Sequence, residues 1–147
     1  MRRDVLGHLM LVTKLLNADM ERSLGPVGLS MVRAQVLWEL GGQQGMTQKA
    51  LADRLGVTPR NVTSLIDALE ATDFVERRPH PTDRRALRLE LTEKGAAFYA
   101  QFQEGFGTFA AQLFDDVSRE RLGLLQAELH QIVTKLTNLA QRESDVG

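Results

Sequence analysis

The stretch around Gly56 constrains the fold of this chain more than any other part of the sequence. Thr47 can cap a short helix that ends at Gly56, the position where a left-handed residue is needed. Thr58 and Pro59 follow, a cap residue and then a proline at the first helical position, which together signal the start of a new helix. The apolar residues of this second helix recur at the spacing of one helix face: Val62, Leu65, Ile66 and Leu69. The sequence therefore predicts two short helices joined by a tight turn.

A two-stranded hairpin is predicted directly after this helix pair. Residues 74–78 have the composition of a strand, and residues 79–83, Pro-His-Pro-Thr-Asp, are typical of a turn. Residues 87–91 alternate strictly between apolar and charged side chains, which is the period of a strand. Because the remaining patterns are helical, the predicted fold class is mostly α with a small β-hairpin wing.

Long amphipathic helices are predicted on both sides of this central region. The first covers residues 1–25, and a second, shorter helix can begin after Ser30. Thr92 can cap another long helix, in which glycines at 105 and 107 favour a bend. A last helix begins near Ser118.

The last helix carries an apolar seam that alternates three- and four-residue steps through more than two heptads. Its members are Leu122, Leu125, Leu129, Ile132, Leu136 and Leu139. This is the spacing of helices that pair with one another. We expect the first helix and the last two to form a dimer interface, and packing within one chain is the alternative.

The composition bounds the class of protein. At 147 residues the chain has the size of one domain, and it contains no cysteine, which excludes disulfides and cysteine-ligated zinc. No apolar run approaches the roughly 18 residues that span a membrane, so we expect a cytoplasmic protein without a membrane partner. Three histidines, His8, His80 and His130, lie far apart in the sequence, and no catalytic constellation is present. We therefore expect no enzyme, no metal site and no cofactor.

The polar face of the second short helix is a candidate DNA-reading surface. Opposite its apolar stripe, and at its start, lie Thr58, Arg60, Asn61, Thr63 and Ser64. Arginine can pair with guanine, asparagine with adenine, and hydroxyls with either, and the second helix of such a pair enters the major groove. A polar face that is merely solvated is the alternative interpretation of this helix taken alone.

The hairpin adds a concentration of arginine. Between residues 77 and 88 there are five arginines and a single acid, Asp83, in a chain whose formal net charge is -1. A local basic stripe beside a candidate recognition helix indicates phosphate binding. A hairpin kept soluble by its charge, or a module that only contacts proteins, are the alternatives.

The hairpin and its flanks resemble a known family. The run from Val75 to Gly95, VERRPHPTDRRALRLELTEKG, is similar to the wing signature of the MarR family: Asp-x-Arg, an alternating strand, then Leu-Thr-x-x-Gly. The resemblance extends in helix order and length over residues 1–147. It implies a winged helix-turn-helix lobe at 30–95 and dimerisation helices at 1–25 and 96–147. It further implies a homodimeric regulator of double-stranded DNA, usually a repressor, often released by a small aromatic or phenolic effector.

The resemblance also assigns roles to residues of the wing. It implies that Arg85 enters the minor groove, that Asp83 orients it, and that Arg84 and Arg77 contact phosphates. One position departs from the family pattern: Asp73 stands where glycine is usual after the recognition helix. Because aspartate tolerates a left-handed backbone better than most residues, we expect the turn to be retained.

Overall fold

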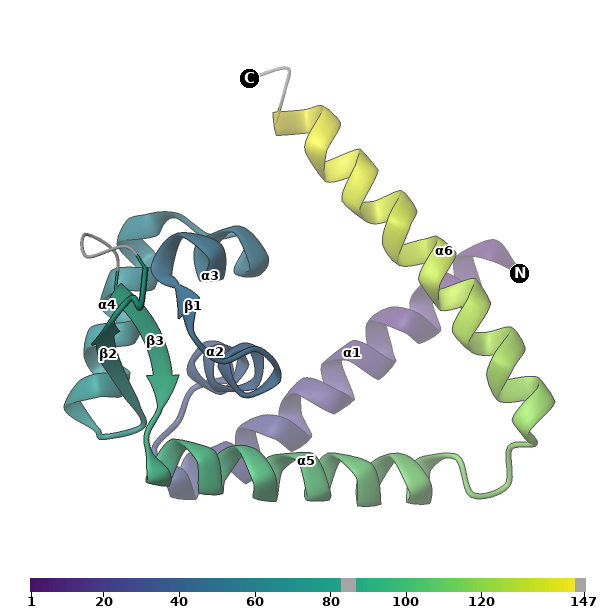
Figure 1. Ribbon diagram of the computed structural model, residues 1–147. Coiled ribbons are helices and arrows are strands. Elements are labelled where there is room, and N and C mark those ends of the chain that lie inside the picture. Colours follow the sequence, from purple (N-terminus) through teal and green to yellow (C-terminus); the bar gives the residue numbers. More distant parts are fainter. Residues whose placement is uncertain (83–86, 145–147) are drawn as a thin grey trace. The chain divides into compact units, whose positions relative to one another are not determined.

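The computed structural model describes residues 1–82 and 87–144. The elements, in chain order, are α1 (Arg2–Leu24), the 3-10 turn η1 (Gly25–Val27), α2 (Met31–Gly42), β1 (Met46–Thr47), α3 (Gln48–Leu55), α4 (Pro59–Ala71), β2 (Val75–Pro79), β3 (Leu87–Leu91), α5 (Glu93–Leu113) and α6 (Arg119–Ser144). Figure 1 shows these elements, in which helices predominate over a small antiparallel sheet. The predicted fold class is therefore confirmed. The chain divides into two compact units, Met1–Gln103 and Glu104–Gly147.

Short-range sequence signals set the helix boundaries of the first unit. The side chains of Ser30, Thr47 and Thr58 each accept a hydrogen bond from the backbone N–H three residues later, at 3.4, 3.2 and 3.3 Å. Gly56 closes α3 with φ +64°, a conformation that a side chain would disfavour. The predicted caps of α2, α3 and α4 and the left-handed turn between α3 and α4 are confirmed.

The core of the first unit lies between α2, α3, α4 and the sheet (Figure 1). The apolar stripes of the three helices and the inner face of the sheet supply its fully buried side chains: Val36, Leu37, Leu40, Leu51, Val62, Ile66, Leu69 and Leu89. Burying a side chain of this size stabilises the fold by about 1.5–3 kcal/mol. This core fixes which side of α4 faces outwards.

The sheet has three strands in the order β1-β3-β2, all antiparallel. β3 covers the predicted residues, and β2 begins one residue later than expected, at Val75. The third strand, β1, was not expected from the sequence. It is only two residues long, and it exists because Met46 and Thr47 pair with Leu89 and Arg88.

The turn between α4 and β2 is held against the start of α5. Asp73 adopts φ +63°, so the left-handed turn expected at this departure from the family pattern is confirmed. The hydroxyl of Thr92 donates to the Asp73 carbonyl at 2.6 Å, and Lys94 Nζ donates to the Thr72 carbonyl at 2.8 Å while lying 4.3 Å from the centre of the Phe74 ring. A cation at a helix C-terminus also complements the helix dipole. These bonds attach α5 to the end of α4.

An aromatic cluster joins α2 to the first part of α5. The Trp38 ring lies 5.6 Å from both Tyr99 and Phe102, and Phe98 lies 5.7 Å from Phe102. These are the tilted and offset arrangements that aromatic pairs prefer. Phe98 and Phe102 of this cluster also pack against the buried core.

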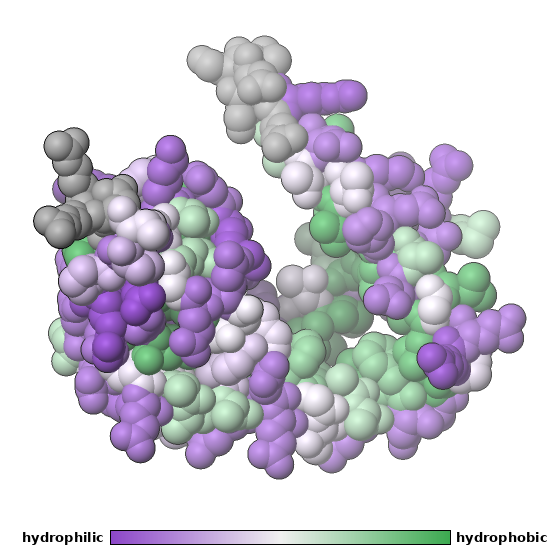
Figure 2. Space-filling model, viewed as in Figure 1, coloured by the Kyte–Doolittle hydropathy of each residue, from purple (hydrophilic) through white to green (hydrophobic). Residues whose placement is uncertain are grey.

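The second unit consists of the end of α5 and the whole of α6. Ser118 accepts a hydrogen bond from Arg121 N–H at 3.3 Å, which confirms the predicted start of the last helix. α5 stays helical through Gly105 and Gly107. Hydrophobic residues remain on the surface of α6 among charged ones (Figure 2), with Leu129 38% and Leu136 61% exposed. Within residues 1–82 and 87–144, no helix is both long and apolar enough to cross a membrane.

Candidate nucleic-acid interface

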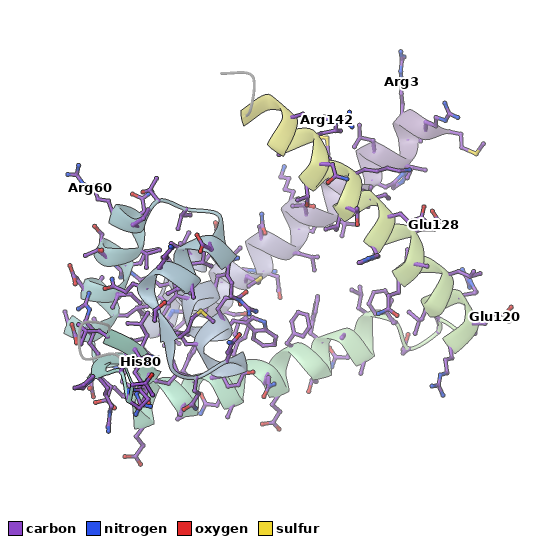
Figure 3. All side chains as sticks on the ribbon, turned by 45° about the horizontal axis from the view of Figure 1, so that its top comes forward. Arg3, Arg60, His80, Glu120, Glu128 and Arg142 are labelled. Carbon is purple, nitrogen blue, oxygen red and sulfur yellow. The ribbon has the colours of Figure 1, made fainter. Side chains whose placement is uncertain are left out.

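The polar face of α4 is turned to solvent. All five candidate residues on this helix are exposed: Thr58, Arg60, Asn61, Thr63 and Ser64. On the opposite side Val62, Ile66 and Leu69 have no exposed surface. Figure 3 shows Arg60 extending outwards from the start of α4. The structure therefore brings these residues together on one surface, as the apolar stripe predicted.

The exposed residues of α4 differ in how far their hydrogen bonds are already satisfied. The hydroxyls of Thr63 and Ser64 donate to the carbonyls of Pro59 and Arg60 at 3.0 and 3.3 Å, and the Thr63 hydroxyl also accepts from Gln48 Nε2 at 3.4 Å. In the described part of the chain, the side chains of Arg60 and Asn61 have no hydrogen-bond partner. Their donors can therefore bind a partner molecule without breaking an internal bond.

The strand β2 alternates between two faces. Val75, which is 1% exposed, and Arg77 lie on the inner face, towards α4, whereas Glu76 and Arg78 lie on the outer face. The hairpin thus directs its arginines to two different environments.

On the inner face, Arg77 is paired with two carboxylates of α4. Its Nη2 lies 2.5 Å from Asp67 Oδ1, and its Nη1 bonds Glu70 Oε2. The Arg77 side chain is only 18% exposed, whereas Asp67 and Glu70 are 59% and 42% exposed. Burial disfavours the charged guanidinium, but the hydrogen bond to Asp67 and the charges of Glu70 and Asp67 outweigh it, so the pKa of Arg77 is raised.

On the outer face, a second set of charges spans both strands. Arg78 bonds Glu76 at 2.6 Å and Glu90 at 3.1 Å, and Arg88 bonds Glu90 at 3.0 Å. The hydrogen bond and charge of Glu76, with the charge of Glu90, raise the pKa of Arg78. These four residues cancel one another's charge.

The structure thereby corrects the charge estimate for the wing. Residues 77–88 contain five arginines and one acid, but residues 67–90 contain five arginines and six acids. Three of the five arginines, Arg77, Arg78 and Arg88, are paired with carboxylates that lie outside the counted stretch. The sequence alone did not indicate their partners, which are Asp67, Glu70, Glu76 and Glu90.

The predicted tip of the wing, Asp83, Arg84 and Arg85, lies outside the described residues. Just before it, Thr82 N–H donates to His80 Nδ1 at 3.4 Å, a local bond typical of a turn. His80 lies in this wing (Figure 3). Across residues 1–82 and 87–144, no group of three or more His, Asp or Glu side chains could hold a metal ion.

Comparison with known proteins identifies the family. The sequence model of the MarR family matches residues 29–87. An uncharacterized HTH-type transcriptional regulator of Mycobacterium bovis is 31% identical over 102 residues, which are 69% of this chain and 70% of that protein. The chain belongs to the MarR family. This MarR-family protein is also 29% identical to the HTH-type transcriptional repressor YetL of Bacillus subtilis, over 86% of this chain and 77% of YetL.

A solved structure confirms the fold of this MarR-family protein. The crystal structure of Streptococcus pneumoniae FabT in complex with DNA matches it with a TM-score of 0.88 at 20% identity, covering 95% of this chain and 99% of that one. This likeness shows the winged helix-turn-helix fold. Because the relatives are transcriptional regulators, family membership excludes the enzyme class.

Proposed function

We propose that this MarR-family protein is a homodimeric transcriptional repressor that binds a pseudo-palindromic operator. In each protomer, α4 enters the major groove, and the wing flanks it at the minor groove. The contacts on α4 are proposed for the exposed polar residues Thr58, Arg60, Asn61, Thr63 and Ser64. At the wing tip, the family resemblance supports Arg85 in the minor groove, Asp83 as the acid that orients it, and Arg84 on a phosphate.

The observation that carries this proposal is the orientation of α4. A capped helix whose apolar face packs into the core presents Arg60 and Asn61 to solvent without internal partners. Arginine and asparagine are the side chains that pair with guanine and adenine in the major groove. Relatives named as helix-turn-helix repressors, and FabT crystallised with DNA, support the same partner.

The charge pairing in the wing reduces the positive charge that the wing offers to DNA. Three of its five arginines are paired with carboxylates, so the alternative of a module that only contacts proteins is no longer opposed by all five. It is opposed by the α4 face and by the regulators among the relatives. The protein–DNA proposal therefore depends chiefly on α4.

The dimer in the proposal is supported by apolar residues that each long helix leaves exposed. On α1 these include Leu6, Met10, Leu11 and Leu15, and on α6 they include Leu125, Leu129, Leu136 and Leu139. Exposed apolar patches of this extent mark interaction surfaces, and a second copy of the chain is the commonest partner.

The family resemblance also supports an effector in the proposal, a small aromatic or phenolic molecule that releases the DNA. Such a ligand must bind the DNA-free arrangement more tightly than the DNA-bound one. Trp38, Phe98 and Phe102 are partly buried and pack against one another, so we assign no ligand residue. Adding benzoate and hydroxybenzoates to a DNA titration tests this part of the proposal.

Selection from a random duplex library tests the proposed function. We expect the purified protein to enrich an inverted repeat whose half-sites are about one helical turn, roughly 10 base pairs, apart centre to centre. Two recognition helices about 34 Å apart require that spacing. A library that stays random after repeated selection, at physiological salt, would contradict the proposal.

A further inference from the structure

Arg77 occupies a place that a phosphate-contacting arginine would not be expected to occupy. It lies on the inner face of β2, two residues after the buried Val75 and opposite the buried Leu89. The period of a strand sends it towards α4, not outwards. The family resemblance implied a phosphate contact for Arg77 as for Arg84, but the alternation of β2 turns Arg77 towards α4.

The two carboxylates that Arg77 binds are three residues apart on α4. Asp67 and Glu70 therefore lie on neighbouring turns of one helix face, and the planar guanidinium engages one with each Nη atom. The Arg77 backbone N–H also donates a hydrogen bond to Glu70 Oε1 at 3.4 Å. Arg77 of β2 thus binds α4 at two points. Two contacts restrict the rotation of the hairpin relative to α4 as well as the distance between them.

The two contacts of Arg77, with Asp67 and with Glu70, join residues on either side of a short connection between α4 and β2. In the chain, α4 and β2 are connected only by Thr72, Asp73 and Phe74, and Asp73 is in the left-handed conformation. Hydrogen bonds from Thr92 and Lys94 hold this connection to the start of α5. The Arg77 pairs attach the hairpin to α4 at a second point, further along β2.

We propose that Arg77 is a positioning residue, which sets the angle of the wing to the recognition helix through Asp67 and Glu70 and makes no phosphate contact. The inference rests on the proposed function, since that angle matters only if helix and wing bind the same duplex. Small misplacements of one contact surface relative to another are costly in binding because both must fit a rigid partner. Arg77 also offsets one of the two negative charges that Asp67 and Glu70 place on the DNA-binding helix.

The double variant Asp67→Asn/Glu70→Gln separates the two roles by the sign of its effect. If Arg77 positions the wing, freeing it lowers the affinity for the selected duplex by about tenfold, even though negative charge has been removed from the protein. If Arg77 contacts phosphate, the same variant binds more tightly, because the arginine is released and the protein is more positive. The matched control, Asp19→Asn/Glu21→Gln on α1, removes the same charge and should not lower the affinity.

The salt dependence of a second variant provides an independent readout. For Arg77→Met we expect weaker binding but an unchanged slope of log affinity against log salt. A lost phosphate contact would reduce that slope by about one for each arginine, about two in a dimer. Circular dichroism and thermal unfolding confirm that each variant is folded. Tighter binding of the double variant or a reduced slope for Arg77→Met would overturn the inference, whereas a parent protein that selects no duplex would instead overturn the proposed function.

Discussion

Replacing Leu129 and Leu136 with aspartate is expected to convert the protein from a dimer into a monomer. Both leucines are at equivalent positions of the α6 seam, seven residues apart, and both are exposed in the single chain. Burying four carboxylates at a dimer interface, two from each copy, costs several kcal/mol per uncompensated charge. The dimer dissociation constant should therefore rise by about a thousandfold or more.

Light scattering at micromolar concentration measures this result directly. The parent should have twice the 16.4 kDa mass of one chain, and the variant should have the mass of one chain. The matched control is Gln131→Asp/Asn138→Asp, which adds the same charge at exposed polar positions, also seven residues apart, on α6.

We also expect the monomer to bind the selected duplex at least about a hundredfold more weakly, because the two half-sites of the DNA are no longer bound by linked protomers. A variant that remains dimeric would show that the α6 seam does not form the dimer interface.

The second large effect is expected at Gly95, at the joint between α4 and α5. A Cβ atom built there would collide with the Phe74 carbonyl oxygen, and it would lie 3.1 Å from the Phe74 carbonyl carbon and 3.3 Å from Leu91 Cβ. The hydrogen bonds from Thr92 and Lys94 hold this turn in place, so it cannot retreat without losing them. Gly95→Ala should reduce the free energy of unfolding by about 3 kcal/mol or more, as overpacking against backbone does.

Urea denaturation of matched glycine variants measures this effect. Gly105 lies in the same helix with open space around it, and Gly105→Ala should raise the free energy of unfolding by about 0.5–1 kcal/mol through helix propensity alone. If the two substitutions change the free energy of unfolding in opposite directions, the close approach of Gly95 to Phe74 is the cause of the destabilisation. If Gly95→Ala is as stable as the parent, the turn at Phe74 is not held rigidly against α5.

The parts of the fold that depend on neighbouring residues were predictable from the sequence. The pair Thr58-Pro59 and the glycine at 56 act within three residues of themselves, and the structure has the cap and the left-handed turn where they were expected. The apolar stripe of α4 likewise defined its exposed face, because a helix that must bury one side presents the other.

The parts of the fold that depend on distant residues were not predictable from the sequence. β1 consists of two residues, too few to show a period, and it is a strand only because Met46 and Thr47 meet β3. The wing arginines appeared free because their partners, Asp67 and Glu90 among them, lie outside the stretch in which the charge was counted. The alternation of β2 from Val75 would have placed Arg77 on the inner face and could have indicated an internal partner.

The most direct test of the DNA-binding role of α4 is a fluorescence-anisotropy titration of the selected duplex. It compares Arg60→Ala/Asn61→Ala with Arg22→Ala/Asn17→Ala, which removes the same side-chain types from exposed positions on α1. Each base-reading pair contributes about 1–3 kcal/mol, and a dimer has two copies, so the α4 variant should bind about a hundredfold more weakly or worse while the α1 variant binds like the parent. If the α4 variant binds the duplex as tightly as the parent at physiological salt, α4 does not read this DNA.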